Sequence, residues 1–328
     1  MDHPLEFACM TCDARVHAKC LGQILLYQHL RGTCSLCGSM LTREALAAAL
    51  RMAFSKSEVI CGPRHGGTAS LGVRLAEVLA TMHKYDEATN VLQDLLGRRL
   101  VPDAELLCRV EAAAVALSAG DARGAAAAAE LLPLFAKTRG RMPKRAIEAA
   151  LVASGGFRIQ QQYDRTWFHV GVAARLTIET RDSIMPVLAE TARIQHDEGQ
   201  REDAVRTRLL ILEEARLKDG DGSQEFASAF SELAHAKVHA GHADAPNAVR
   251  DAISGLAGVP PRDWLLQAHL RRLRECLALT AAPARRIRAK SRQASVEYRA
   301  KTTRSFRHCS VAALRSSSEL AAAYARTR

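Results

Sequence analysis

The sequence predicts a mainly α-helical protein with a small metal-binding module at its N-terminus. From Leu71 onward the 328-residue chain is rich in Ala and Leu and has almost no runs of β-branched residues. Its apolar residues recur every three or four positions, which is typical of amphipathic helices. By contrast, five of the nine cysteines lie between Cys9 and Cys37, and His17 lies among them at ligand spacing. The two parts therefore have different sources of stability.

The N-terminal part contains three pairs of metal-ligating residues, each with two intervening positions: Cys9 and Cys12, His17 and Cys20, Cys34 and Cys37. On a tight turn both side chains of such a pair can reach one metal ion, and four groups from two pairs complete the tetrahedral coordination of zinc. We find no secretory leader, so a dense thiolate cluster favours a metal site over a disulfide framework. The sequence therefore predicts Zn²⁺ binding.

A helix is expected directly after the cysteines. Thr42 is a suitable N-cap, Glu44 complements the positive end of the helix, and strong helix formers continue to Phe54. We assign residues 1–54 to the zinc-binding module with its trailing helix. Residues 55–70 are rich in Gly and Pro and are expected to form a linker.

Five polar turns punctuate the helical part of the chain. They end at positions 88, 125, 166, 204 and 246, with separations of 37, 41, 38 and 42 residues. This spacing indicates a degenerate repeat of about forty residues, in which each turn joins two helices. The sequence alone leaves open a non-repetitive α-helical domain.

One repeat carries a family resemblance. Leu75-Ala76, then His83-Lys84-Tyr85-Asp86-Glu87-Ala88 and Leu92, resembles a tetratricopeptide repeat, with small residues where the helices approach closely. The resemblance covers residues 71–280 and implies an array of α-helical hairpins that recruits protein partners on a concave surface.

The C-terminal 281–328 segment is expected to be a basic arm. It contains twelve Lys and Arg residues against Glu297 and Glu319, a balance of +10 out of a net +11 for the whole chain. Such an arm is attracted to nucleic acid, acidic lipid or an acidic partner, or is simply the solvated side of terminal helices. Nucleic-acid association through this arm is therefore one of the alternative functions.

The order of the six N-terminal ligands resembles the treble-clef zinc modules of PHD fingers and of RING-like or RING-variant fingers. In those families the first and third ligand pairs share one zinc, which would here be held by Cys9, Cys12, Cys34 and Cys37. His17 and Cys20 would belong to a second zinc site, whose other ligand pair is missing. The resemblance thus implies one complete zinc site and one doubtful site.

These features favour a zinc-binding protein-interaction scaffold. A RING-like module would act as a component of a ubiquitin ligase by positioning a ubiquitin-conjugating enzyme, while the helical array recruits the other partner. The alternative is a non-catalytic adaptor with a purely structural zinc. The sequence contains no motif that is typical of an enzyme with its own active site. A zinc ion with four thiolate ligands has no open position for a substrate, so such a site is structural.

The location is expected to be intracellular, either cytoplasmic or nuclear. No stretch of about 18 uncharged apolar residues could span a membrane. The remaining cysteines, Cys61, Cys108, Cys276 and Cys309, are far apart in sequence and are expected to be free thiols, mostly buried.

Overall fold

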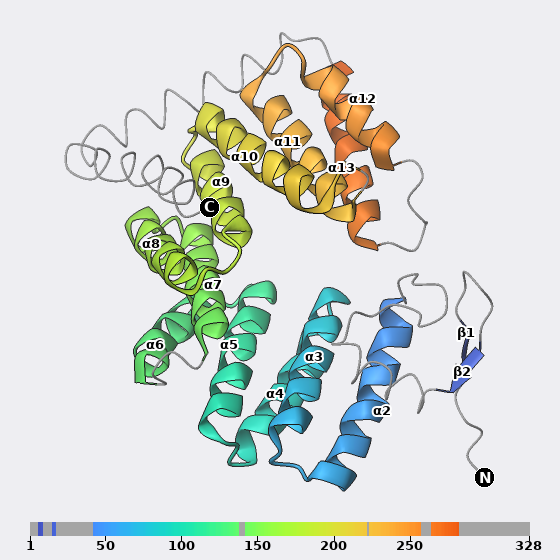
Figure 1. Ribbon diagram of the computed structural model, residues 1–328, viewed down its shortest axis with the longest axis vertical. Helices are drawn as coiled ribbons and strands as arrows, with labels where there is room; N and C mark the ends of the chain where they lie inside the picture. The colour runs from blue at the N-terminus through green and yellow to red at the C-terminus, as the bar shows by residue number, and fades with distance from the viewer. Residues whose placement is uncertain are drawn as a thin grey trace. The chain divides into compact units, whose positions relative to one another are not determined.

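The computed structural model describes residues 6–8, 15–17, 42–137, 142–221, 223–256 and 264–281 (Figure 1). The first two of these segments are short strands, β1 (Glu6–Ala8) and β2 (Arg15–His17). They pair antiparallel, with Phe7 opposite Val16. The sequence analysis did not predict these strands.

The predicted zinc ligands fall around this hairpin. His17 is the last residue of β2. The described residues do not include the other predicted ligands, which are Cys9, Cys12, Cys20, Cys34 and Cys37. Residues 282–328 of the basic arm also lie outside them. The zinc site therefore stays a prediction.

The rest of the described chain is mainly helical, which confirms the mainly α-helical part of the predicted fold class. The helices are α2 (Arg43–Cys61), α3 (Gly66–Thr81), α4 (Tyr85–Gly97), α5 (Pro102–Ser118), α6 (Arg123–Lys137), α7 (Pro143–Ile159), α8 (Tyr163–Thr180), α9 (Met185–Asp197), α10 (Arg201–Asp219), α11 (Gln224–Ala240), α12 (Ala245–Leu256) and α13 (Trp264–Ala281). None of these helices is long and apolar enough to cross a membrane.

The helices repeat as hairpins. Each predicted turn coincides with the connection from an odd-numbered helix to the even-numbered helix that follows it. At the same place in each connection the backbone adopts a positive φ, at His83, Gly120, Gln161, Gly199 and Gly241. A left-handed residue ends a helix and reverses the chain in few residues. The predicted punctuation is therefore a repeated C-terminal helix stop.

The start of the array differs from the expected layout. Thr42 caps α2 as predicted, because its hydroxyl accepts a hydrogen bond from the backbone N–H of Ala45 at 3.2 Å. However, α2 continues to Cys61 and α3 already begins at Gly66, so most of the expected linker 55–70 is helical. The residues from Ser55 to Cys61 lack Gly and Pro, and the stop comes only at Gly62, with φ +93°.

Contacts divide the chain into two units, residues 1–169 and 170–328, with the boundary inside α8. In the first unit α2 packs on α3. Helix α3 packs on its hairpin partner α4 and on α5, and helix α5 packs on its hairpin partner α6 and on α7. A buried cluster that includes Leu50, Leu75, Leu92 and Leu95 joins α2, α3 and α4.

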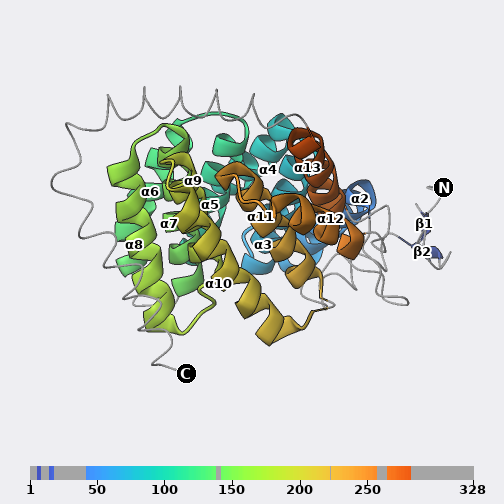
Figure 2. The ribbon, with the colours of Figure 1, turned by 90° about the horizontal axis from the view of Figure 1, so that it is seen from above.

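The second unit shows part of this pattern. Helix α10 packs against both α9 and α11, and α13 packs against both α11 and α12 (Figure 2). Val205, Ile211 and Leu233 belong to one buried cluster, and Val249 and Leu273 to the next. Contact between α11 and α13 places two odd-numbered helices side by side, as α3 and α5 are in the first unit.

Small residues permit the close helix contacts of the first unit. A Cβ atom added at Gly124 would lie 2.5 Å from the backbone oxygen of Ala113 and 2.8 Å from the side chain of Leu117. Backbone of α5 therefore touches α6 directly at this point. The buried cluster here consists of Ala113, Ala125, Ala128, Ala153 and Phe157.

We predict that Gly124→Ala lowers the free energy of unfolding by about 1–3 kcal/mol, because the added methyl group overlaps backbone that cannot easily move. Gly171→Ala is the matched control, since no atom lies within 4 Å of a Cβ added inside α8. That change should stabilise the protein by about 0.5–1 kcal/mol through helix propensity. Urea unfolding followed by circular dichroism measures both, and equal effects of the two substitutions would contradict the close contact.

Candidate functional site

A pocket with a volume of about 640 Å³ lies in the second unit. Its walls come from α9, α10, α11 and α13, so three odd-numbered helices contribute to one face. Small and apolar side chains, such as Ala189, Ile211 and Ala229, form part of the lining, and charged side chains form the remainder. The pocket is therefore an amphipathic surface built by the stacking of the hairpins.

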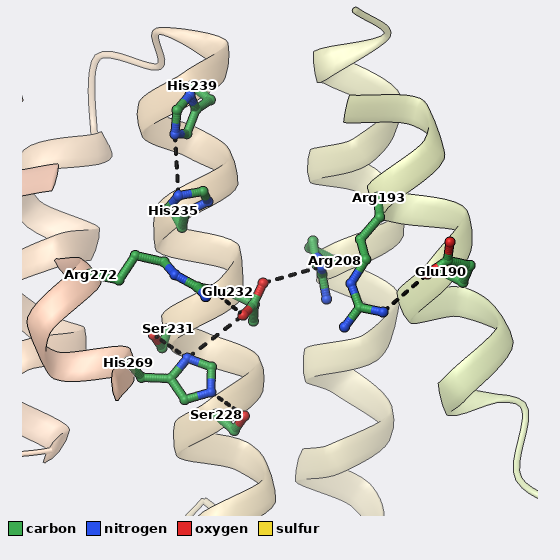
Figure 3. A network of polar contacts seen from close by, with 10 residues as sticks. All are labelled: Glu190, Arg193, Arg208, Ser228, Ser231, Glu232, His235, His239, His269 and Arg272. Atoms are coloured by element: carbon green, nitrogen blue, oxygen red, sulfur yellow. Dashed lines mark hydrogen bonds and ion pairs between the residues drawn. The ribbon is translucent and has the colours of Figure 1, made fainter. Parts of the chain in front are cut away.

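Glu232 of α11 is the centre of the polar network in this pocket (Figure 3). Its carboxylate accepts a hydrogen bond from Nη1 of Arg272 at 2.8 Å. Nη2 of Arg208 lies 3.2 Å from the other carboxylate oxygen. One carboxylate thus joins α10, α11 and α13.

Arg208 is a deeply buried charged member of the network, because its side chain is only 9% exposed. Burial lowers the pKa of its guanidinium, and the positive charges of Arg193 and Arg272 lower it further, against the opposing effect of Glu232. Burial alone would raise the pKa of Glu232, but Arg208, Arg272 and two histidines lower it overall. Glu232 is therefore ionised and holds two positive groups in place.

His269 of α13 is held by two hydroxyl groups of α11. Its Nε2 lies 3.1 Å from Oγ of Ser228, and its Nδ1 lies 3.1 Å from Oγ of Ser231. Nδ1 is also 3.7 Å from Glu232. These contacts satisfy both nitrogen atoms of a buried imidazole and fix α13 against α11.

Arg193 of α9 completes the pocket from the opposite side. Its Nη1 donates a hydrogen bond to the buried carboxylate of Glu190 at 3.1 Å. About half of the Arg193 side chain remains exposed, as does about half of the Arg272 side chain. A guanidinium has five N–H donors, so both groups can donate further hydrogen bonds into the pocket.

The sequence analysis did not find this network. The available signal was Arg208, which stands among the buried positions Val205, Ile211 and Leu212 of α10. A charged residue on a buried helix face requires a partner, and that partner, Glu232, lies on another helix.

A second polar feature lies on the odd-numbered helices of the first unit. Glu111 of α5 is close to the ion pair of Arg74 with Glu77 on α3 and to that of Arg145 with Glu148 on α7. Burial raises the pKa of Glu111 to about 8, and the carboxylates of Glu77 and Glu148 contribute. The folded protein therefore holds a proton on Glu111 at neutral pH.

The described residues contain no group of three or more His, Cys, Asp or Glu side chains placed to hold a metal ion. Three of the four isolated cysteines are described, and all three are free thiols, with Cys108 and Cys276 buried and Cys61 exposed. Cys309 lies outside the described residues.

Comparisons with known proteins give structural neighbours only. No protein-family model matches the chain, and no curated protein matches it. Two crystal structures of nearly identical TPR-like repeats, described as kinesin light chain repeats from Podosopora anserina, are similar to it. The first is 17% identical, with a TM-score of 0.47, and the match covers 57% of this chain and 93% of that one. The second is 16% identical, with a TM-score of 0.44, and the match covers 67% and 99%.

Because its pKa is raised on folding, Glu111 makes stability depend on pH. Between pH 4.5 and about 8 the folded state binds the proton that the unfolded state releases, so stability falls as pH rises across this range. We predict that Glu111→Gln increases the free energy of unfolding at pH 8, by on the order of 1 kcal/mol or more, and changes it little at pH 4.

Urea titrations at both pH values measure this difference. Glu105→Gln, on the same helix and paired with Arg109, controls for loss of a carboxylate in general. An effect of Glu111→Gln that is equal at the two pH values would contradict the raised pKa.

Proposed function

We propose that this protein is an interaction scaffold whose helical hairpins recruit a protein partner through the pocket of the second unit. The proposal rests on the packing of α9 on α10, α10 on α11 and α11 on α13, which combines apolar side chains and charged groups around one pocket. A stacked helical array presents such a surface without any one hairpin having to form it alone. No catalytic chemistry is required for this role.

The polar groups of the pocket favour an acidic partner segment. The carboxylate of Glu232 is already used by Arg208 and Arg272, and that of Glu190 is used by Arg193. The charged groups that remain for a ligand are the N–H donors of Arg193 and Arg272 and the exposed carboxylate of Glu225, so the lining keeps an excess of one positive charge. The carboxylate of an Asp or Glu side chain can accept two hydrogen bonds from one guanidinium group, in a bidentate arrangement.

We predict that Arg272→Gln weakens binding of an acidic peptide by about tenfold, because a charge-assisted hydrogen bond contributes about 1.5–3 kcal/mol. The probe is a fluorescein-labelled peptide of alternating Glu and Ala, and its affinity is measured by fluorescence anisotropy. Arg250→Gln is the matched control, since Arg250 is exposed on α12 and does not line the pocket. Equal affinities of the two variants would contradict the proposed site.

A zinc module at the N-terminus is the second element of the proposed function. Its support is the β1–β2 pairing, since residues 9–14 connect two paired strands and contain Cys9 and Cys12. A tight connection can bring two thiolates to one ion. We propose one zinc, bound by Cys9, Cys12, Cys34 and Cys37, with His17 and Cys20 as candidates for a second.

The zinc proposal predicts about one zinc per chain and its loss in Cys34→Ser. Structural zinc contributes on the order of 10 kcal/mol to a small fold, so this variant should lose the N-terminal module. The far-ultraviolet circular dichroism of the helices should be retained. Elemental analysis measures the zinc content. The proposal would be contradicted if wild-type protein purified without zinc does not bind zinc when it is added.

A ubiquitin-ligase role is the finer version of this proposal. The zinc module would bind a conjugating enzyme, and the helical array would bind the substrate, so that the two are held close together. Ubiquitin transfer by a panel of conjugating enzymes tests it. Absence of any product from a zinc-loaded protein would leave the adaptor role with a purely structural zinc.

A further inference from the structure

Three histidines of the second unit form a cluster beside the pocket. His235 and His239 lie four residues apart on α11, and His196 lies on α9. Nε2 of His235 is 3.2 Å from Nε2 of His239. Figure 3 draws this contact between the two rings. The proposed binding of an acidic segment does not use any of these side chains.

The spacing of the two nitrogen atoms is that of metal ligands. Two imidazole nitrogens bound to one tetrahedral zinc at about 2.0–2.1 Å stand about 3.3 Å from each other. The same distance also permits one ring to donate a hydrogen bond to the other. Residues four apart share one helix face, which is the arrangement of the two histidines in helical zinc sites.

His196 is close enough to join the pair. Its ring centroid lies 5.0 Å from that of His239 and 6.5 Å from that of His235, and the rings of His235 and His239 are 4.4 Å apart. As the rings now stand, the described residues provide no complete group of three ligands. The minimal site is therefore the pair on α11 with water, and His196 completes it only by turning its ring.

The surroundings keep both rings of the pair uncharged. Burial lowers the pKa of His235 to about 4, and the neighbouring His239, His196 and Arg272 contribute, against the effect of Glu232. Burial also lowers the pKa of His239, with contributions from His196 and Arg201. A neutral imidazole has the lone pair that a metal ion needs.

We propose that His235 and His239 bind a divalent transition-metal ion such as Zn²⁺ or Ni²⁺, with His196 as the additional ligand that links α11 to α9. This site is separate from the predicted cysteine site, since it lies in the second unit. It requires neither the acidic partner nor the N-terminal zinc.

Equilibrium dialysis of the full chain against Ni²⁺ tests the site. The wild type should bind one more ion per chain than His239→Gln. His242→Gln is the matched control, because His242 follows α11 directly and contacts Glu202 at 3.0 Å instead of the cluster. The cysteines are the same in all three proteins, so they cancel in the comparison. Equal Ni²⁺ content of the wild type and His239→Gln would overturn the proposal.

If the His239→Gln variant does not fold, a measurement on the wild type alone tests whether the histidines bind metal. In ¹⁵N-labelled protein, Zn²⁺ added beyond saturation of the thiolates should shift the ring-nitrogen resonances of two or three histidines. The titration is made at pH 7.5, where the lowered pKa values of His235 and His239 favour neutral rings. Unshifted histidine resonances would overturn the proposal, and peptide binding is not a readout in either experiment.

Discussion

Close contact between helix backbones is the constraint on which the rest of this structure depends. Where α5 meets α6, no side chain larger than hydrogen fits at Gly124. Alanine occupies most of the neighbouring buried positions. In the same unit α5 also packs on the odd-numbered helices α3 and α7.

The pocket of the second unit also depends on packing between several helices. Its charged groups come from four helices, and no hairpin contains them all. Glu232 compensates the burial of Arg208 and also orients Arg272. Loss of its charge would leave a buried guanidinium without its partner, which is far more costly than loss of an exposed ion pair. The same carboxylate therefore serves both the packing of the second unit and the shape of the proposed binding surface.

Local features of the fold could be predicted from the sequence. The five polar turns could be predicted because each one needs a residue with positive φ and polar neighbours, and these residues are adjacent in the sequence. Thr42 was recognised as a cap for the same reason. The linker expected at 55–70 was too long, because the density of Gly and Pro after Gly62 was extended to residues before it that favour helix.

The site could not be predicted, because its members are distant in sequence. Arg208 and Glu232 are on successive helices, and His269 comes from a third. Nothing local to Glu232 distinguishes it from an exposed helical glutamate. The high pKa of Glu111 likewise depends on charges from α3 and α7. The zinc ligands differ from this site, because their pattern is formed by residues close together in the sequence and could be recognised there. All of them except His17 lie outside the described residues.

The central claim is that acidic segments bind where Arg193 and Arg272 face the pocket. The most direct measurement is the side-chain Nε–H resonances of arginine during titration of the full chain with the acidic peptide. The account predicts that the signals of Arg193 and Arg272 shift with saturation, while that of Arg250 on α12 does not. Binding of the peptide without any shift of the Arg193 and Arg272 signals would contradict it.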